Sequence, residues 1–309
     1  MAAVSATALA LALAGLVGAT GAQAAPQAGA AGQASRAADV VQRATGTADI
    51  ARSTTGAGGA TAQVSKPSGS VVVTAPTTAS GRVAVTAANG STVTVALPAT
   101  TGTAGVTTAE GTTVYPGAAR GTDLAVQATT DGGARALVTL KDSSASTEQR
   151  FDLGLPDNTR LVPADGGYDI VQNGASGAAF SLGHIDAPWA KDATGKSLHT
   201  SYRLEGNTLI QSIDTDKNTA FPVVADPKWT WGWVTGTVYF DKNETGHTAA
   251  DSAFVAAVFA FAPPPFDVYG VLNAANISRV AWNAQNDNQC VEIKIPTFQA
   301  YEYSGGYCN

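Results

Sequence analysis

Hydrophobic and polar residues alternate in short segments through the middle of the chain. In residues 82–86, for example, Val83 and Val85 are separated by a small residue, Ala84, and this period of two is typical of a half-buried β-strand. Pairs such as Asn89-Gly90 and Asp131-Gly132 lie between segments and supply the positive φ that tight hairpins need. The predicted strands are 70–74, 82–86, 92–97, 123–128, 134–140, 158–162, 168–171 and 207–213.

The gaps between these segments are too short for crossover helices. The pattern therefore predicts an antiparallel β-sandwich or barrel-like domain over residues 67–227. Proline fixes φ and donates no hydrogen bond, so Asp226-Pro227 is expected to end this domain.

Residues 228–309 follow a mixed pattern. The run 229–240 predicts one long strand, 241–246 a polar turn, and 253–262 a helix that is apolar on every face and begins after a Thr248 cap. A second helix is predicted from Asp267 to about residue 285, followed by strands that begin near 291 and 301. The order β-α-α-β-β defines a small α+β module.

The N-terminus resembles a secretory signal peptide over residues 1–24. An apolar run, 8–18, is followed by the small-x-small site Ala22-Gln23-Ala24. The run is too short and too rich in Gly and Ala to span a bilayer well. Because no Lys or Arg precedes it, we expect the true start codon to lie upstream. These features predict a secreted, extracellular protein without a transmembrane span in its mature chain.

Residues 25–66 are rich in Ala, Gly, Thr, Ser and Gln and contain no aromatic residue. Such a composition buries little apolar surface to offset the entropy lost on ordering. We expect a disordered linker here, or a short marginal helix near residues 37–51.

Three strings in the middle of the chain carry a family resemblance: YPGAARGTDL at 115–124, APWAKDATG at 187–195 and FPVVADP at 221–227. They resemble the β-rich leader segments of secreted, wall-associated actinobacterial proteins of the Rhs/YD-repeat type. The resemblance implies secretion and a β-rich fold, and it implies no catalytic activity. In those proteins a variable C-terminal module follows the segment, and this chain departs from them because no YD repeats follow.

The C-terminal region is similar to another group. The strings WGWVTGTVYFDKNET at 231–245, CVEIKIP at 290–296 and YSGGYC at 303–308 resemble small secreted actinobacterial proteins of unknown function. This similarity transfers no functional residue.

Cys290 and Cys308 are the two cysteines of the chain. In an oxidising compartment they are expected to form a disulfide across the last hairpin. Loop closure of this size contributes about 3 kcal/mol in the chain-entropy model. The alternatives are a catalytic thiol and an intermolecular bond.

Charge and composition exclude several functions. The net charge of -6 provides no basic excess for phosphate neutralisation, so we expect no nucleic-acid partner. His184 and Asp186 lie on one side of a predicted strand, but a metal site needs three or four ligands. The string 190–197 matches only the loosest phosphate-binding loop and favours a polar hairpin turn. We therefore predict no metal, no cofactor and no catalytic residue.

Aromatic residues gather at the start and end of the C-terminal module. Side chains at alternate positions of a strand share a face, so the tryptophans of the long strand are expected on one side. Such a face is suited to stacking on sugar rings or to a membrane interface, whereas packing against the β domain is the alternative. The candidate ligand-binding residues are Trp229, Trp231, Trp233, Tyr239, Tyr301 and Tyr303.

These observations favour a secreted, non-enzymatic protein whose C-terminal module binds a cell-envelope component such as a cell-wall glycan. A toxin- or bacteriocin-like effector that attacks membranes with its apolar helix pair is one alternative. A secreted hydrolase is another, because the members of a Ser-His-Asp triad meet only in space.

Overall fold

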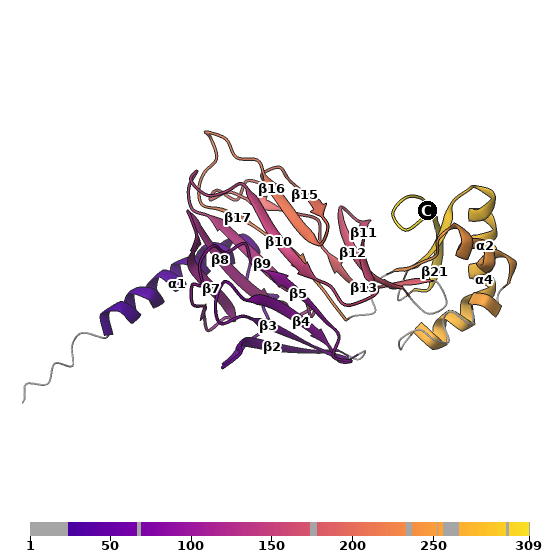
Figure 1. Cartoon of the computed structure of the whole chain (residues 1–309), viewed down its shortest axis with the longest axis horizontal. Helices are drawn as coiled ribbons and strands as arrows, with labels where there is room; N and C mark the ends of the chain where they lie inside the picture. Colours follow the sequence, from indigo (N-terminus) through magenta and orange to yellow (C-terminus); the bar gives the residue numbers. More distant parts are fainter. Residues whose placement is uncertain are drawn as a thin grey trace, which may run out of the picture.

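The computed structural model describes residues 24–309 except 67–68, 174–177, 233–236, 252, 256–265, 295–296 and 309. Two antiparallel sheets form a sandwich-like arrangement (Figure 1). The eight-stranded sheet has the order β1 (Thr54–Gly56), β2 (Gly59–Lys66), β3 (Gly69–Ala75), β4 (Arg82–Ala87), β5 (Thr92–Ala96), β10 (Glu148–Gly154), β16 (Thr208–Ile213) and β15 (Thr200–Glu205).

The second sheet has thirteen strands. Its main path runs through β21 (Gln299–Tyr303), β20 (Cys290–Lys294), β19 (Thr237–Tyr239), β13 (Ala179–Ile185), β18 (Lys228–Trp229), β9 (Ala134–Leu140), β8 (Thr122–Ala128), β7 (Thr112–Ala119) and β6 (Val106–Thr107). Its remaining strands are β11 (Thr159–Ala164), β12 (Gly167–Asn173), β14 (Ala190–Lys191) and β17 (Val223–Ala225). The predicted mainly β, antiparallel sandwich is thus confirmed.

The period-two pattern determines which side chains fill the sandwich. In β4 and β5 the buried positions are Val83, Val85, Val93 and Val95, and the residues between them are partly exposed. Leu124 and other side chains of the opposing sheet belong to the same buried cluster. Alternation therefore directs one face of each sheet into a shared apolar core.

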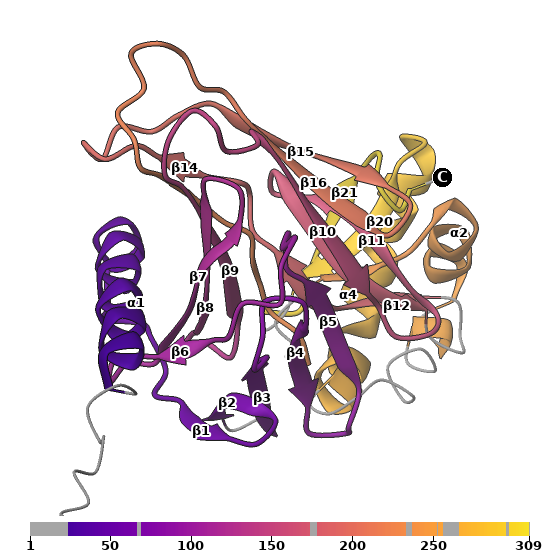
Figure 2. The same ribbon diagram turned by 60° about the vertical axis from the view of Figure 1, so that its left-hand side comes forward.

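Strands β7, β8 and β9 are buried on both faces, and a helix covers the outer one. Helix α1 (Ala24–Thr45) buries a stripe of small residues against the outward side chains of these strands (Figure 2). This stripe repeats at i, i+3, i+4 and i+7, the spacing of one helix face. The buried cluster is Ala34, Ala37, Ala38, Val41, Val114, Ala125, Leu137 and Val224.

The prediction of a disordered linker over residues 25–66 is wrong. Most of this segment is regular secondary structure, in α1, β1 and β2. The alternative of a short helix near 37–51 placed the helix too late in the chain. Composition was misleading because alanine buries little surface by itself but allows a helix to approach an apolar sheet closely. The predicted signal peptide lies outside the described residues, apart from Ala24.

The sheet continues across the predicted domain boundary at 227/228. Trp229 of β18 pairs with Ala134 of β9 and with Ile185 of β13, and β19 pairs with β13 and β20. The predicted single strand over 229–240 is replaced by two short ones, β18 and β19, and residues 233–236 lie outside the described part. Strands β19, β20 and β21 therefore belong to the thirteen-stranded sheet, and we call these three strands the extension.

Two helices cover part of this extension. Helix α2 (Lys242–Ala250) occupies the segment predicted to be a polar turn, because Asp241 and Glu244 form a reciprocal capping box at its N-terminus. The predicted Thr248 cap is therefore wrong, since Thr248 lies inside α2. Helix α4 (Phe266–Asn286) agrees with the second predicted helix. Residues 253–255 are helical, but most of the predicted apolar helix lies outside the described residues.

Candidate functional site

Two of the three candidate tryptophans are core residues. Trp229 and Trp231 are each only 1% exposed and belong to the sandwich core. The indole nitrogen of Trp231 donates to Ser91 O at 3.2 Å, which ties the segment to the β4–β5 turn. Burial removes both rings from any ligand-binding surface, so the alternative, packing against the β domain, holds for them. Trp233 lies outside the described residues.

The candidate tyrosines lie elsewhere, at the end of the extension. Tyr239 and Tyr303 line a cavity of about 180 Å³, whereas Tyr301 is 46% exposed and does not line it. We call this cavity the tyrosine pocket. Its lining residues are Val162, Pro163, Ala164, Asp165, Tyr239, Glu292, Lys294, Tyr303, Ser304, Gly305, Gly306 and Tyr307.

Three aromatic rings meet at this pocket, and two of them, Tyr239 and Tyr307, are buried, being 4% and 5% exposed. The ring centres of Tyr239 and Tyr303 are 5.5 Å apart in an edge-to-face arrangement, and Tyr307 lies 6.2 Å from Tyr239. The Arg160 guanidinium lies 4.0 Å from the centre of the Tyr307 ring, a cation–π geometry that holds this ring in place. The sequence patterns did not predict Tyr307 as part of the site.

Hydrogen bonds orient two of the phenols. The Tyr239 hydroxyl donates to Asp169 Oδ2 at 2.8 Å, and the Tyr303 hydroxyl donates to Phe240 O at 3.1 Å. Burial raises the pKa of both hydroxyls above the usual range, and it raises the pKa of Tyr307 to about 12. All three side chains therefore stay neutral at physiological pH.

The disulfide shapes one wall of the pocket. The predicted bond between Cys290 and Cys308 is present, with 5.5 Å between the Cα atoms, and this prediction is confirmed. It anchors the C-terminal turn to β20 and thereby places Tyr307 beside the sheet. Gly306 in that turn has φ +57°, and a Cβ there would lie 3.1 Å from Val162 Cγ1, so a larger residue would crowd the wall.

Two of the charged groups at the pocket are paired with each other. Lys294 Nζ lies 3.1 Å from Glu292 Oε1 and also 3.1 Å from Thr237 Oγ1. Glu244, in the adjacent capping box, has its pKa raised to about 7 by burial. The pocket therefore offers neutral rings, a compensated pair of charges and the exposed carboxylate of Asp165 to a ligand.

Two histidines form pairs with aspartates. His184 Nδ1 lies 2.7 Å from Asp169 Oδ1, and His199 Nδ1 lies 2.9 Å from Asp214 Oδ2 on an exposed surface. Asp169 thus connects His184 to Tyr239. Among the described side chains, no serine hydroxyl is hydrogen-bonded to either ring, so neither pair is seen as part of a triad.

The string 190–197 forms a turn around Asp192. The Asp192 carboxylate accepts from the amides of Thr194 and Lys196, at 2.9 and 3.1 Å. These amides are therefore used by the protein itself and do not cradle a phosphate, in agreement with a polar turn.

Within the described ranges, no group of three or more His, Cys, Asp or Glu side chains is placed to hold a metal ion. The helices among these residues are also too short or too polar to cross a membrane.

The comparisons with known proteins provide no relative for this site. No protein-family model, no curated protein and no solved structure matches the chain.

Proposed function

We propose that this chain is a secreted, non-enzymatic protein that binds a neutral glycan of the cell envelope in the tyrosine pocket. The observation that carries the proposal is the convergence of Tyr239, Tyr303 and Tyr307 on one cavity. Tyr239 and Tyr307 are buried and form the back of the pocket, so Tyr303, the partly exposed ring, is the one placed to contact the apolar face of a sugar. Neighbouring polar groups can accept from or donate to sugar hydroxyls.

The charge and the volume of the tyrosine pocket favour a small ligand without negative charge. Lys294 and Glu292 neutralise each other and the phenols are uncharged, while the exposed Asp165 carboxylate adds a negative charge that disfavours anions. A cavity of about 180 Å³ accommodates a single sugar ring or the end of a chain.

Secretion is consistent with the disulfide beside the pocket. Disulfides form and persist in oxidising compartments, and the Cys290–Cys308 bond anchors the wall that carries Tyr307. The predicted signal peptide supports the same localisation.

Retention of the purified chain on insoluble peptidoglycan tests the proposal. The decisive variant is Ser304→Trp, because Ser304 is an exposed lining residue and an indole there fills the cavity without removing a core contact. We expect at least tenfold weaker retention of this variant. The matched control is Tyr301→Ala, which removes an exposed tyrosine outside the pocket and should leave retention unchanged.

The alternatives give different results in the same assay. Equal retention of wild type and Ser304→Trp, or no retention of the wild type, would refute the pocket as a glycan site. Shortening of the glycan during incubation would instead indicate a hydrolase. Dye release from phospholipid vesicles would indicate the membrane-active alternative.

A further inference from the structure

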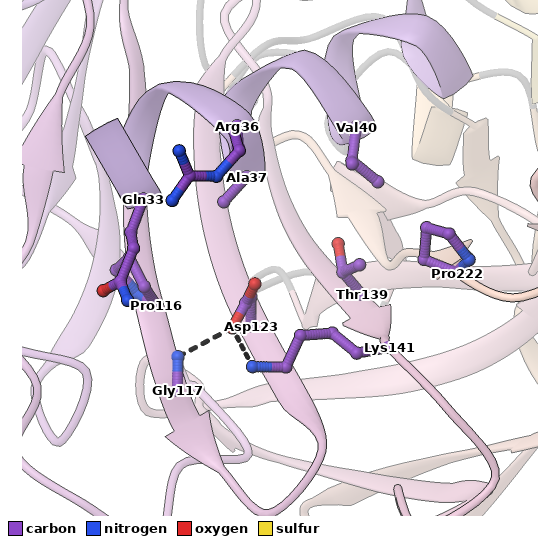
Figure 3. Close-up of a pocket in the computed structure, with 10 residues that line it drawn as sticks. All are labelled: Gln33, Arg36, Ala37, Val40, Pro116, Gly117, Asp123, Thr139, Lys141 and Pro222. Carbon is purple, nitrogen blue, oxygen red and sulfur yellow. Dashed lines mark hydrogen bonds and ion pairs between the residues drawn. The ribbon is translucent and has the colours of Figure 1, made fainter. Parts of the chain in front are cut away.

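Helix α1 lies at the opposite end of the molecule from β21 (Figure 1). Two neighbouring cavities are lined by residues of α1. The larger has a volume of about 340 Å³ and the smaller about 190 Å³, and both are lined by Val40 and Pro222. We call the two together the α1 groove. Figure 3 shows the larger cavity, whose lining comes from the helix on one side and from strands on the other.

The α1 groove is lined by four basic side chains. Arg36 and Lys141 line the larger cavity, and Arg43 and Lys191 line the smaller one. This concentration is unusual in a chain whose net charge is -6. A local excess of positive charge in a concave surface attracts anions.

The two carboxylates that line the groove are already engaged. Asp123 lies 2.9 Å from Lys141 Nζ and accepts from the Gly117 amide at 2.7 Å. Asp192 accepts from the amides of its own turn, including that of Thr194. Asp123 is neutralised by Lys141, whereas Asp192 keeps its negative charge, so the lining has four cations against two carboxylates, an excess of two positive charges.

The two arginines are the free cations of the groove. In the described part of the chain, neither Arg36 nor Arg43 forms an ion pair, and both are exposed. Asp39 lies three residues after Arg36 and four before Arg43, so its exposed carboxylate is a neighbour of both on the helix surface and offsets part of their charge. By contrast, Lys191 Nζ donates to Ala44 O at 3.1 Å.

The spacing of the two arginines favours a polymer over a small ion as the ligand. Arg36 and Arg43 are seven positions apart on α1, which corresponds to about 10 Å along the helix axis. They lie on the same face, and each lines a different cavity. Guanidinium groups bind phosphate and carboxylate in bidentate geometry, so the groove presents two such positions in line.

We propose that the α1 groove binds a linear polyanion that carries phosphate or carboxylate groups, with Arg36 and Arg43 as its principal contacts. This site is separate from the tyrosine pocket, with which it shares no lining residue.

The test measures binding of the full chain to three polymers at low salt: polyphosphate, polyglutamate and neutral dextran. The double variant Arg36→Gln/Arg43→Gln should bind the polyanion at least tenfold more weakly. The control is Arg52→Gln/Arg279→Gln, which removes the same charge from exposed positions outside the groove and should change binding less than twofold. Dextran should not bind to the groove in either case.

A second variant separates the cavity from net charge. Val40→Trp fills the point shared by the two cavities without changing charge, and it should also weaken polyanion binding at least tenfold. Binding of only polyphosphate or only polyglutamate would identify the anionic group. Failure of the wild type to bind either polyanion, or equal binding by Arg36→Gln/Arg43→Gln, would overturn the proposal. Ser304→Trp should bind the polyanion as the wild type does. Failure of the glycan proposal can therefore be distinguished from failure of the polyanion proposal.

Discussion

Strands β4 and β5 bury valines in the centre of a two-sheet sandwich, whereas β19 and β20 extend one of those sheets, continue the same apolar core with Val238, Val291 and Ile293, and in addition bury Tyr239 and a disulfide. The hydrogen-bonded ladder is continuous between the regions, but the means of stabilisation change. Inside the sandwich, two apolar faces cover each other. The extension has helices α2 and α4 as its cover and adds a covalent bond at its end.

This difference indicates where in this fold a binding site can form. A closed apolar core leaves little space, as shown by the cavity of about 10 Å³ beside Trp229. Aromatic and polar groups meet at the edge of the extension, where packing is less complete and the tyrosine pocket opens.

The largest effect is expected at the tryptophans that join the two regions. Replacement of fully buried Trp231 by Ala should lower the free energy of unfolding by about 3–5 kcal/mol, measured by urea denaturation. The control is Trp282→Ala, because Trp282 is 59% exposed and an exposed substitution changes stability by about 0.5 kcal/mol or less. Similar small effects at both positions would contradict the assignment of Trp231 to the core.

A pH effect is expected at Asp226, at the junction itself. Burial raises its pKa from 3.8 to about 7, and its Oδ2 atom has no hydrogen-bond partner among the described residues. The folded state therefore holds the proton more tightly than the unfolded state, so stability present below about pH 4 is lost as pH rises to about 7. The loss is at most about 4 kcal/mol.

Asp226→Asn removes this titration. We expect the unfolding free energy of the variant to lose that part of the pH dependence between pH 4 and 7, measured by denaturation at several pH values. Asp214→Asn, at an exposed site, is the control and should preserve the wild-type slope. An unchanged slope in Asp226→Asn would show that this carboxyl is not the source.

The disulfide should stabilise the extension more than the sandwich. Cys290→Ser/Cys308→Ser should cost about 3 kcal/mol by the loop-entropy model, with hydrogen exchange rising first in β20 and β21. Protection in β8 and β9 should persist under conditions where the extension opens. A uniform loss of protection in all of these strands would mean that the two regions unfold as one unit.

The smallest effect is expected at His184. Its hydrogen bond to Asp169 raises the pKa of His184 above 6.5 in the folded state. The pair therefore contributes its full share of the unfolding free energy below pH 6.5, and this contribution is lost as the pH rises through the raised pKa of the folded state. We expect His184→Gln to remove about 1 kcal/mol of this pH-dependent stability, seen as a smaller difference between denaturation at pH 5.5 and 8.5. His199→Gln, at an exposed pair, should leave the difference almost unchanged.

The local patterns predicted much of the sandwich because period-two alternation and Asn-Gly or Asp-Gly turns are short-range signals. They missed β7, whose first four residues are all buried, and β10, which alternates but has only Phe151 and Leu153 as apolar members. Burial on both faces removes the polar half of the alternation. For the site, Tyr239 and Tyr303 were identified, but their partner Tyr307 was missed because a pocket formed by four strands and a turn has no sequence spacing.

The sequence by itself determined the antiparallel strands, the disulfide partners and helix α4, since each depends on neighbouring residues or on the number of cysteines. Only the tertiary structure decided which aromatic rings are buried and what α1 covers. Both questions depend on which surfaces meet across the fold: the alanines of α1 are stabilised by an outward apolar face of β7–β9, and Trp229 and Trp231 are enclosed by a distant sheet.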